Sequence, residues 1–184
     1  ISGFFGKFIG DRNSEILTSV LVSISALFSI HVLYQVIVNQ YEENIVIATW
    51  ISSGSLDVNW SMLIDPLSAV MLVVVTSVSA LVHIYSIGYM SHDPHKPRFM
   101  AYLSLFTFAM LMLVTSDNFI QLFFGWEGVG LCSYFRIGFW FKKETANAAA
   151  IKAFVVNRVG DFGFALGIFL IFYLFGTVNY TEVF

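Results

Sequence analysis

Long apolar runs separated by short polar segments dominate the chain. Five such runs cover residues 16–38, 66–90, 99–115, 119–141 and 146–175. A helix of about 17 residues or more can cross the hydrocarbon core of a membrane. Lipid leaves backbone groups no water to bond, and none of these runs alternates as a barrel strand would. We therefore predict an all-α integral membrane protein with about five complete transmembrane helices.

Polar residues and prolines mark the ends of these runs. Asp65 precedes Pro66, and an acid at the N-cap followed by a proline in the first turn is typical of a helix start. The segment DPHKP precedes the third run, and SDN precedes the fourth. Between the first two helices, residues 39–61 contain Ile, Val, Thr and Trp around SSGS. We expect this loop to be a hairpin or an amphipathic segment at the membrane surface.

We divide the chain into residues 1–61 and residues 62–184. The first unit holds the tail of a preceding helix at about residues 1–10, the helix at 16–38 and the loop 39–61. The second unit holds the other four helices. The chain begins without Met, has no signal-peptide pattern and stops just after a helix, so we expect a piece of a longer protein.

Composition supports the membrane class and excludes several others. Apolar residues make up 58% of the 184 residues and charged residues only 11%, which is less than half of the roughly 25% found in soluble domains. The net charge of -3 and the scattered basic residues do not suggest a nucleic-acid partner. A single cysteine, Cys132, excludes an internal disulfide framework and a site with several thiolates.

Positive charges alternate between the loops and predict the orientation. They lie in the N-terminal segment and in the loops after the second and fourth helices, as Lys7, Arg12, Lys96, Arg98, Lys142 and Lys143. The loops after the first, third and fifth helices contain acids and no Lys or Arg. By the positive-inside rule, the basic loops and the N-terminus face the cytoplasm or matrix, and the C-terminal end faces the other side.

A glutamate interrupts the fourth apolar run. Glu127 lies eight residues into the predicted helix, which is about 12 Å from its start and near the middle of the membrane. A charge at that depth costs a few kcal/mol and points to a function. The alternative is a protonated carboxyl that only holds helices together. Gly125, Gly128 and Gly130 would let a helix or water approach, and Trp126 would either hydrogen-bond inward or pack as an aromatic ring.

The fifth run carries three more ionisable residues. Arg158 and Asp161 are three residues apart, share a helix face and can pair. Lys152, near the inner end, either extends its ammonium group to the interface or supplies protons. The chain has no nucleotide loop, haem motif or cluster motif. The remaining chemistry is a proton or cation relay, with purely structural pairing as the alternative.

Other polar or small residues within the runs suggest structural roles. His83 is expected to be a neutral, hydrogen-bonded imidazole, and Gly163 and Gly167 are spaced as a helix-packing surface. Arg136 lies nine residues from Glu127, about half a turn around the helix. We therefore expect Arg136 to extend toward the inner surface and not to pair with that glutamate.

Four segments resemble chain 5 of proton-pumping NADH:quinone oxidoreductase, a family also called subunit L. The two most specific are LFFGWEGVGLCSYFRIGFWF, which contains Glu127, and AAAIKAFVVNRVGDFGFALGIF, which contains Arg158 and Asp161. LIDPLSAVMLVVVTSVSALVHIYSIGYM and RFMAYLSLFTFAMLMLV extend the resemblance, which covers the chain from about residue 56. The family usually has Leu-Leu where this chain has Phe135 and Arg136.

The resemblance implies part of an antiporter-like helical bundle at the distal end of the membrane arm of respiratory complex I. Such a subunit couples electron transfer from NADH to quinone to proton pumping. By resemblance, Glu127 modulates a channel lysine on a helix beyond residue 184, and Arg158 and Asp161 pair near the inner half-channel. Residues 62–184 would begin the proton-translocating domain. Lys152, which we include from its position near the inner end of the fifth run, completes the expected relay.

The resemblance also implies partners and a location. NADH, FMN, iron–sulfur clusters and quinone would bind to partner subunits, and this chain would bind no cofactor and no metal. Its partners would be other membrane-arm subunits of complex I and the lipid bilayer, with no nucleic acid. The location would be the mitochondrial inner membrane or the bacterial plasma membrane. The alternative function is a subunit of a multi-subunit Na+/H+ antiporter.

Overall fold

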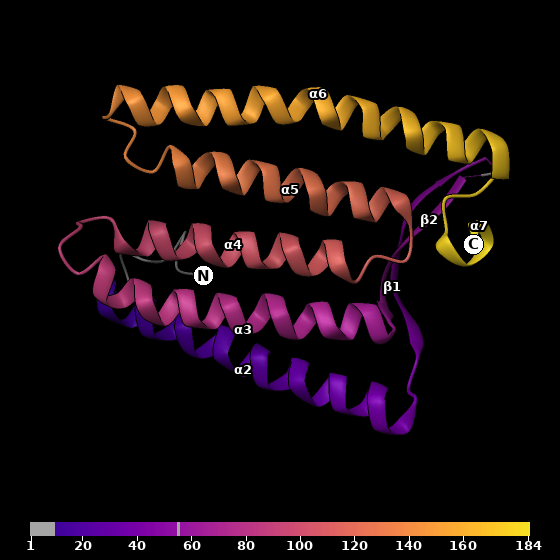
Figure 1. The fold of residues 1–184 in the computed structure, drawn as a ribbon, viewed down its shortest axis with the longest axis horizontal. Helices are drawn as coiled ribbons and strands as arrows, with labels where there is room; N and C mark the ends of the chain where they lie inside the picture. The colour runs from indigo at the N-terminus through magenta and orange to yellow at the C-terminus, as the bar shows by residue number, and fades with distance from the viewer. Residues whose placement is uncertain (1–9, 55) are drawn as a thin grey trace.

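The computed structural model describes residues 10–54 and 56–184 as a row of antiparallel helices with a β-hairpin at one end (Figure 1). The elements are α2 (Asp11–Asn39), β1 (Glu43–Ser53), β2 (Leu56–Ile64), α3 (Pro66–Tyr89), α4 (Lys96–Val114), α5 (Phe119–Ile137), α6 (Glu144–Phe175) and α7 (Tyr180–Val183). The predicted helical membrane fold is confirmed. The helix tail predicted for residues 1–10 falls on residues 1–9, outside the described residues.

Four of the described helices, α2, α3, α4 and α6, are long and apolar enough to cross a membrane. The prediction had five. Helix α5 is as long as α4, at 19 residues. It is not among the four, because Gln121, Glu127 and Arg136 interrupt its apolar sequence. It nevertheless lies in the row between α4 and α6 (Figure 1). Glu127 therefore lies on a helix whose apolar sequence is interrupted, whereas Arg158 and Asp161 lie on α6, one of the four apolar helices.

Three helices begin earlier than predicted, and one of them, α6, begins at Glu144 instead of residue 146. Helix α2 begins at Asp11 instead of residue 16, so several polar residues are helical before the apolar run starts. Helix α4 begins at Lys96 instead of residue 99, with Pro97 in its first turn. A proline there removes no hydrogen bond, because the first N–H groups of a helix have no intrahelical partner.

Helix α5 ends earlier than predicted. It stops at Ile137 with Gly138 as the C-cap, and residues 138–141 do not continue the helix to the predicted end at 141. Phe139 is buried, and the Arg98 guanidinium lies 4.7 Å from the centre of its ring. Arg98 Nη2 also donates to the Phe139 carbonyl at 3.0 Å. The chain after α5 is therefore held against the start of α4.

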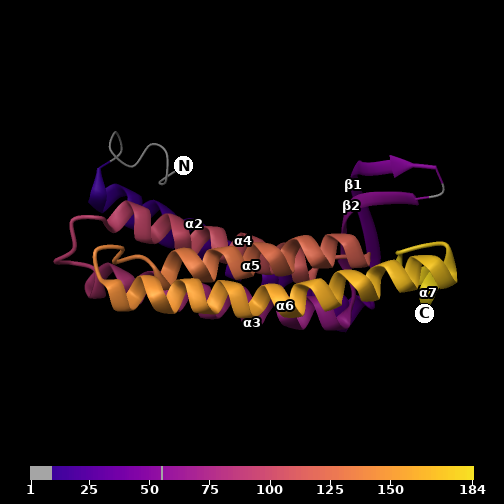
Figure 2. The same ribbon diagram turned by 90° about the horizontal axis from the view of Figure 1, so that it is seen from above.

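The two ends of the bundle differ in charge. The start of α2, the α3–α4 loop and the α5–α6 loop lie at one end, and the hairpin, the α4–α5 loop and α7 lie at the other (Figures 1 and 2). Basic residues of the first end are Arg12, Lys96, Arg98, Lys142 and Lys143. Their shared location agrees with the predicted alternation. The side of the membrane that this end faces stays a prediction.

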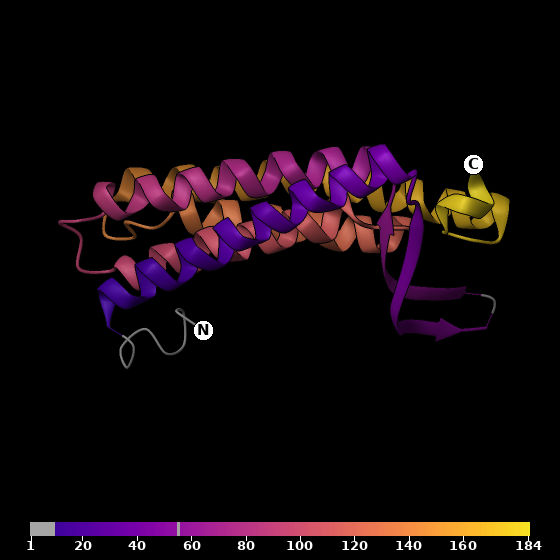
Figure 3. The same ribbon diagram turned by 90° about the horizontal axis from the view of Figure 1, so that it is seen from below.

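The segment between the first two helices is a hairpin and not an amphipathic segment. Strands β1 and β2 pair antiparallel, with Glu43 opposite Ile64, and project from the helix end (Figures 2 and 3). Strand β2 extends past the predicted loop end at residue 61 and leads into α3. Asp65 caps α3, since its Oδ1 accepts from the Ser68 N–H at 2.6 Å. The division of the chain at residue 61 stays a prediction.

Gln121 ties the hairpin to α5. Its side chain is fully buried and accepts from the Ser61 N–H at 3.0 Å while donating to the Ser61 carbonyl at 2.7 Å. One turn earlier, Asn118 Nδ2 donates to the Asn59 carbonyl at 3.0 Å. These bonds pair backbone groups that would otherwise be unsatisfied beside the helices. The hairpin therefore fixes the start of α5, the helix that carries Glu127.

Candidate functional site

Helices α5 and α6 bring three ionisable side chains together. Arg158 Nη1 forms an ion pair and a hydrogen bond with Glu127 Oε2. The same nitrogen lies 3.6 Å from Asp161 Oδ2. The side chain of Asp161 is 10% exposed, that of Glu127 23% and that of Arg158 41%. One guanidinium thus lies between two carboxylates from two helices, and we call these three residues the charge cluster.

The charge cluster confirms one predicted pair and adds a contact that was not predicted. The pairing of Arg158 with Asp161 was expected from their spacing, and it is present. Glu127 was expected to have its partner beyond residue 184, yet Arg158 of this chain contacts it. A signal was available, because charges inside a membrane usually face one another. The two residues are 31 positions apart, however, and spacing alone does not align two helices.

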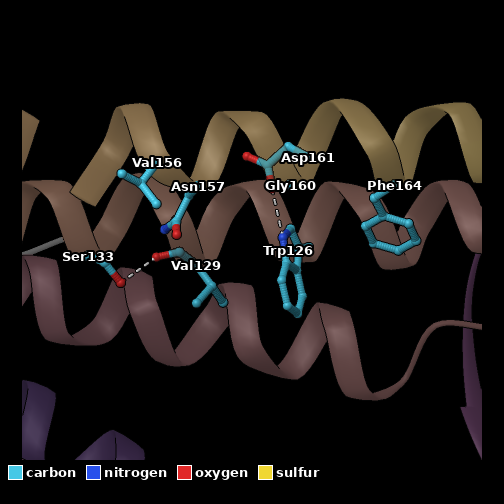
Figure 4. A pocket seen from close by; sticks show the side chains of 9 residues that line it. Trp126, Val129, Ser133, Val156, Asn157, Gly160, Asp161 and Phe164 are labelled. Carbon is cyan, nitrogen blue, oxygen red and sulfur yellow. Dashed lines mark hydrogen bonds between the residues drawn. The ribbon is translucent and has the colours of Figure 1, made fainter. Parts of the chain in front are cut away.

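Trp126 holds the other oxygen of Asp161. Its Nε1 donates to Asp161 Oδ1 at 2.9 Å, as the dashed line in Figure 4 marks. Its ring also meets Phe164 nearly edge to face, with centroids 6.0 Å apart and planes at 87°. The sequence left hydrogen bonding and aromatic packing as alternatives for Trp126, and the side chain does both.

A cavity of about 500 Å³ between α5 and α6 borders Asp161, whereas Glu127 and Arg158 do not line it (Figure 4). Its polar lining comes from Trp126, Ser133, Asn157 and Asp161. Gly130 of α5 also borders it, where a larger side chain would fill the space. The rest of the lining is apolar and includes Val129, Val156 and Phe164.

Two families match the chain. Residues 50–100 match the N-terminal part of chain 5 of NADH-ubiquinone oxidoreductase (complex I), and residues 116–184 match the transmembrane region of NADH:quinone oxidoreductase and Mrp antiporters. Chain 5 of NADH-ubiquinone oxidoreductase from Triticum aestivum is 56% identical over 184 residues, which are 100% of this chain and 28% of that relative. Subunit L of NADH-quinone oxidoreductase from Rickettsia bellii is 50% identical over 184 residues, which are 100% of this chain and 29% of that relative.

The chain belongs to the chain 5 family of NADH:quinone oxidoreductase. It spans less than a third of the length of these curated relatives. With its apolar helices, this chain 5 family member is a multi-pass protein of the mitochondrial or bacterial inner membrane.

Two solved structures share the fold of this chain 5 family member. The Mrp complex from Dietzia sp. DQ12-45-1b matches with a TM-score of 0.80 and 22% identity, over 100% of this chain and 19% of that one. The archaeal membrane-bound sulfane sulfur reductase matches with a TM-score of 0.83 and 19% identity, over 99% of this chain and 37% of that one. At such identities the likeness shows the fold alone.

Lys152 of this chain 5 family member lies apart from the charge cluster. It is exposed on α6, six residues before Arg158, and therefore about 9 Å away along the helix. The ion pairs of the described residues do not include it. Its place in a relay stays a prediction. Within residues 10–54 and 56–184, no group of three or more His, Cys, Asp or Glu residues is arranged to hold a metal ion.

Two of the three glycines around Glu127 let α4 approach α5. A Cβ at Gly125 would lie 2.7 Å from backbone atoms of Leu113, and one at Gly128 would lie 3.0 Å from the Ala109 Cβ. A Cβ at Gly130 would meet nothing within 4 Å. The predicted close approach is therefore confirmed at the first two positions.

The predicted packing surface on α6 has no partner within the described chain. A Cβ at Gly163 or Gly167 would have no atom within 4 Å, so none of the described helices packs there.

Arg136 and His83 are not part of the charge cluster. The Arg136 guanidinium lies 5.1 Å from the centre of the Phe106 ring, and its ion pairing with Glu127 is absent from the described contacts, as predicted. His83 is fully buried between α3 and α4, with Nδ1 2.8 Å from a backbone carbonyl of its own helix and Nε2 3.2 Å from Ser104 Oγ. The hydrogen-bonded imidazole expected from the sequence is thus present.

Proposed function

We propose that this chain is part of a membrane-arm subunit of NADH:quinone oxidoreductase that translocates protons. The observation that carries this proposal is the charge cluster, in which Glu127 and Asp161 share Arg158 inside an apolar bundle. Charges in such surroundings are expensive unless they are paired, and they mark ion pathways in membrane proteins.

The composition of the charge cluster suggests how it would act. Two carboxylates share one guanidinium, so one carboxylate is always the less well paired. When a proton or a second positive charge reaches Glu127, Arg158 becomes free to pair fully with Asp161. Protonation at one carboxylate is thereby coupled to the charge state of the other. The family resemblance supplies a candidate for that second charge, a channel lysine beyond residue 184.

The role of Lys152 in the proposal rests on its position on α6, that of the cavity on its lining, and those of the partner subunits on the resemblance. Lys152 would supply protons from the inner end of α6, and the cavity beside Asp161 would admit water. NADH, FMN, iron–sulfur clusters and quinone would bind to partner subunits, and this chain would contribute no cofactor site. Other membrane-arm subunits and lipids would cover its apolar outer surface.

A second candidate function is a subunit of a multi-subunit Na+/H+ antiporter. It draws support from the match of residues 116–184 to a family that includes both oxidoreductases and Mrp antiporters. The identity of 56% to a chain 5 protein, against 22% to the Mrp structure, favours the first function.

Transport by the intact complex separates the two functions. The complex that contains the full-length subunit is reconstituted into liposomes, and internal pH is followed while NADH reduces a quinone outside. We expect NADH-driven proton uptake of equal size with and without Na+, abolished by an uncoupler. Exchange of Na+ for protons without NADH oxidation would instead establish the antiporter.

A further inference from the structure

Trp126 contributes a polar group to the charge cluster. We propose that Trp126 is a positioning residue, whose indole N–H holds Asp161 so that Arg158 stays available to Glu127. This inference rests on the proposed proton relay and names a residue that regulates the balance within it.

The two oxygens of Asp161 have different partners. Oδ1 accepts the Trp126 N–H at 2.9 Å from α5, and Oδ2 faces Arg158 Nη1 at 3.6 Å on α6. The first distance is that of an ordinary hydrogen bond, whereas the second is longer than one. The Asp161 side chain is only 10% exposed, so little water can reach it. Among the described side chains, Trp126 is the one that donates a hydrogen bond to it.

The direct hydrogen bond of Arg158 Nη1 goes to Glu127 and not to Asp161. A neutral donor can stabilise a carboxylate without adding a charge to the cluster. Trp126 therefore gives the Asp161 carboxylate a hydrogen-bond partner while the guanidinium bonds to Glu127. Without that N–H, Asp161 would depend on Arg158 alone, and the guanidinium would move away from Glu127.

One helix alignment produces both contacts. Trp126 and Glu127 are consecutive on α5, and they reach Asp161 and Arg158, which share one face of α6. Trp126 is 52% exposed, so filling a core does not account for its position. Figure 4 shows its ring extending from α5 toward Asp161.

Two substitutions at this position separate the N–H from the ring. In the full-length subunit within the reconstituted complex, W126F keeps an aromatic ring and removes the donor, whereas W126Q keeps a donor and removes the ring. We expect W126F to lower the ratio of protons pumped to electrons transferred by about twofold or more, and W126Q to restore most of it. W140F is the matched control, because Trp140 Nε1 donates to Asp93 Oδ2 at 3.1 Å outside the cluster, and its ratio should be unchanged.

A double-mutant cycle tests whether Trp126 acts through Asp161. W126F should have no further effect in a D161N background, because the bond it removes already lacks its charged acceptor. A wild-type ratio in W126F, or an effect that adds to that of D161N, overturns the inference. If W126F does not assemble, W126Q, which keeps a donor, is compared with W126L, which has none. Equal ratios of protons pumped to electrons transferred in these two variants overturn the inference.

E127Q in the same assay keeps the two proposals distinguishable. A lowered ratio in E127Q with a wild-type ratio in W126F overturns the role of Trp126 and leaves the relay standing. A wild-type ratio in E127Q overturns the relay itself.

Discussion

Arg158 determines the charge balance of the cluster, because it is the cation that both acids contact. Replacing it with Leu leaves two carboxylates close together without a counter-charge. Breaking a fully buried pair in this way costs on the order of 3–5 kcal/mol, and we expect less here because 41% of the Arg158 side chain is exposed. R158L should therefore lower the unfolding temperature of the assembled complex.

Removing one acid at the same time should recover part of that loss. The double variant E127Q/R158L is expected to unfold at a higher temperature than R158L, since only one carboxylate then lacks a partner. R12L is the control, because Arg12 is exposed and lies at the end of α2, far along the chain from the cluster. Equal unfolding temperatures for R158L and the double variant would contradict the pairing described here.

The sequence identified the members of the charge cluster but not all of its contacts. Glu127, Arg158 and Asp161 stood out because charges are rare in apolar runs, and the spacing of the last two predicted their pairing. The contacts of Glu127 with Arg158 and of Trp126 with Asp161 connect different helices. They depend on how α5 and α6 rotate and align, which the pattern of either helix alone does not fix.

At the scale of elements, α4 and α5 approach one another where α5 has glycine instead of a side chain. G125A would place a Cβ 2.7 Å from Leu113 backbone atoms, so the helices would have to separate, at a cost of about 1–3 kcal/mol. Thermal unfolding of the assembled complex measures this loss. G88A in α3 is the control, since a Cβ there meets nothing within 4 Å. If the two variants were equally stable, the close approach would not matter.

The existence and order of the helices were predictable from hydropathy, whereas several of their ends were not. The sequence predicts a helix start after Pro97, whereas Pro97 lies in the first turn of α4. Phe139 belongs to an apolar run, but α5 ends before it. Its ring and its carbonyl contact Arg98 instead, and the apolar pattern does not predict this tertiary contact. The sequence does not distinguish the hairpin from an amphipathic segment. The pairing of β1 with β2 and the bonds of β2 to Gln121 form only in the folded chain.

At the scale of the whole molecule, the bundle is an apolar body with an ionic link between α5 and α6. The 19 residues of α4 span about 28 Å, close to the thickness of a hydrocarbon core. Glu127 lies near the middle of α5, well away from the basic end of the bundle. In the proposed relay, a proton would therefore meet the Glu127 carboxylate near the middle of the membrane, beside Arg158 and Asp161.

The most direct test of this account is the ratio of protons pumped to electrons transferred in the complex whose full-length subunit carries Glu127→Gln. The substitution keeps the size of the side chain and removes the charge that pairs with Arg158. We predict a lowered ratio in a complex that assembles and still oxidises NADH. A wild-type ratio in the assembled variant would contradict the role of Glu127 in proton translocation.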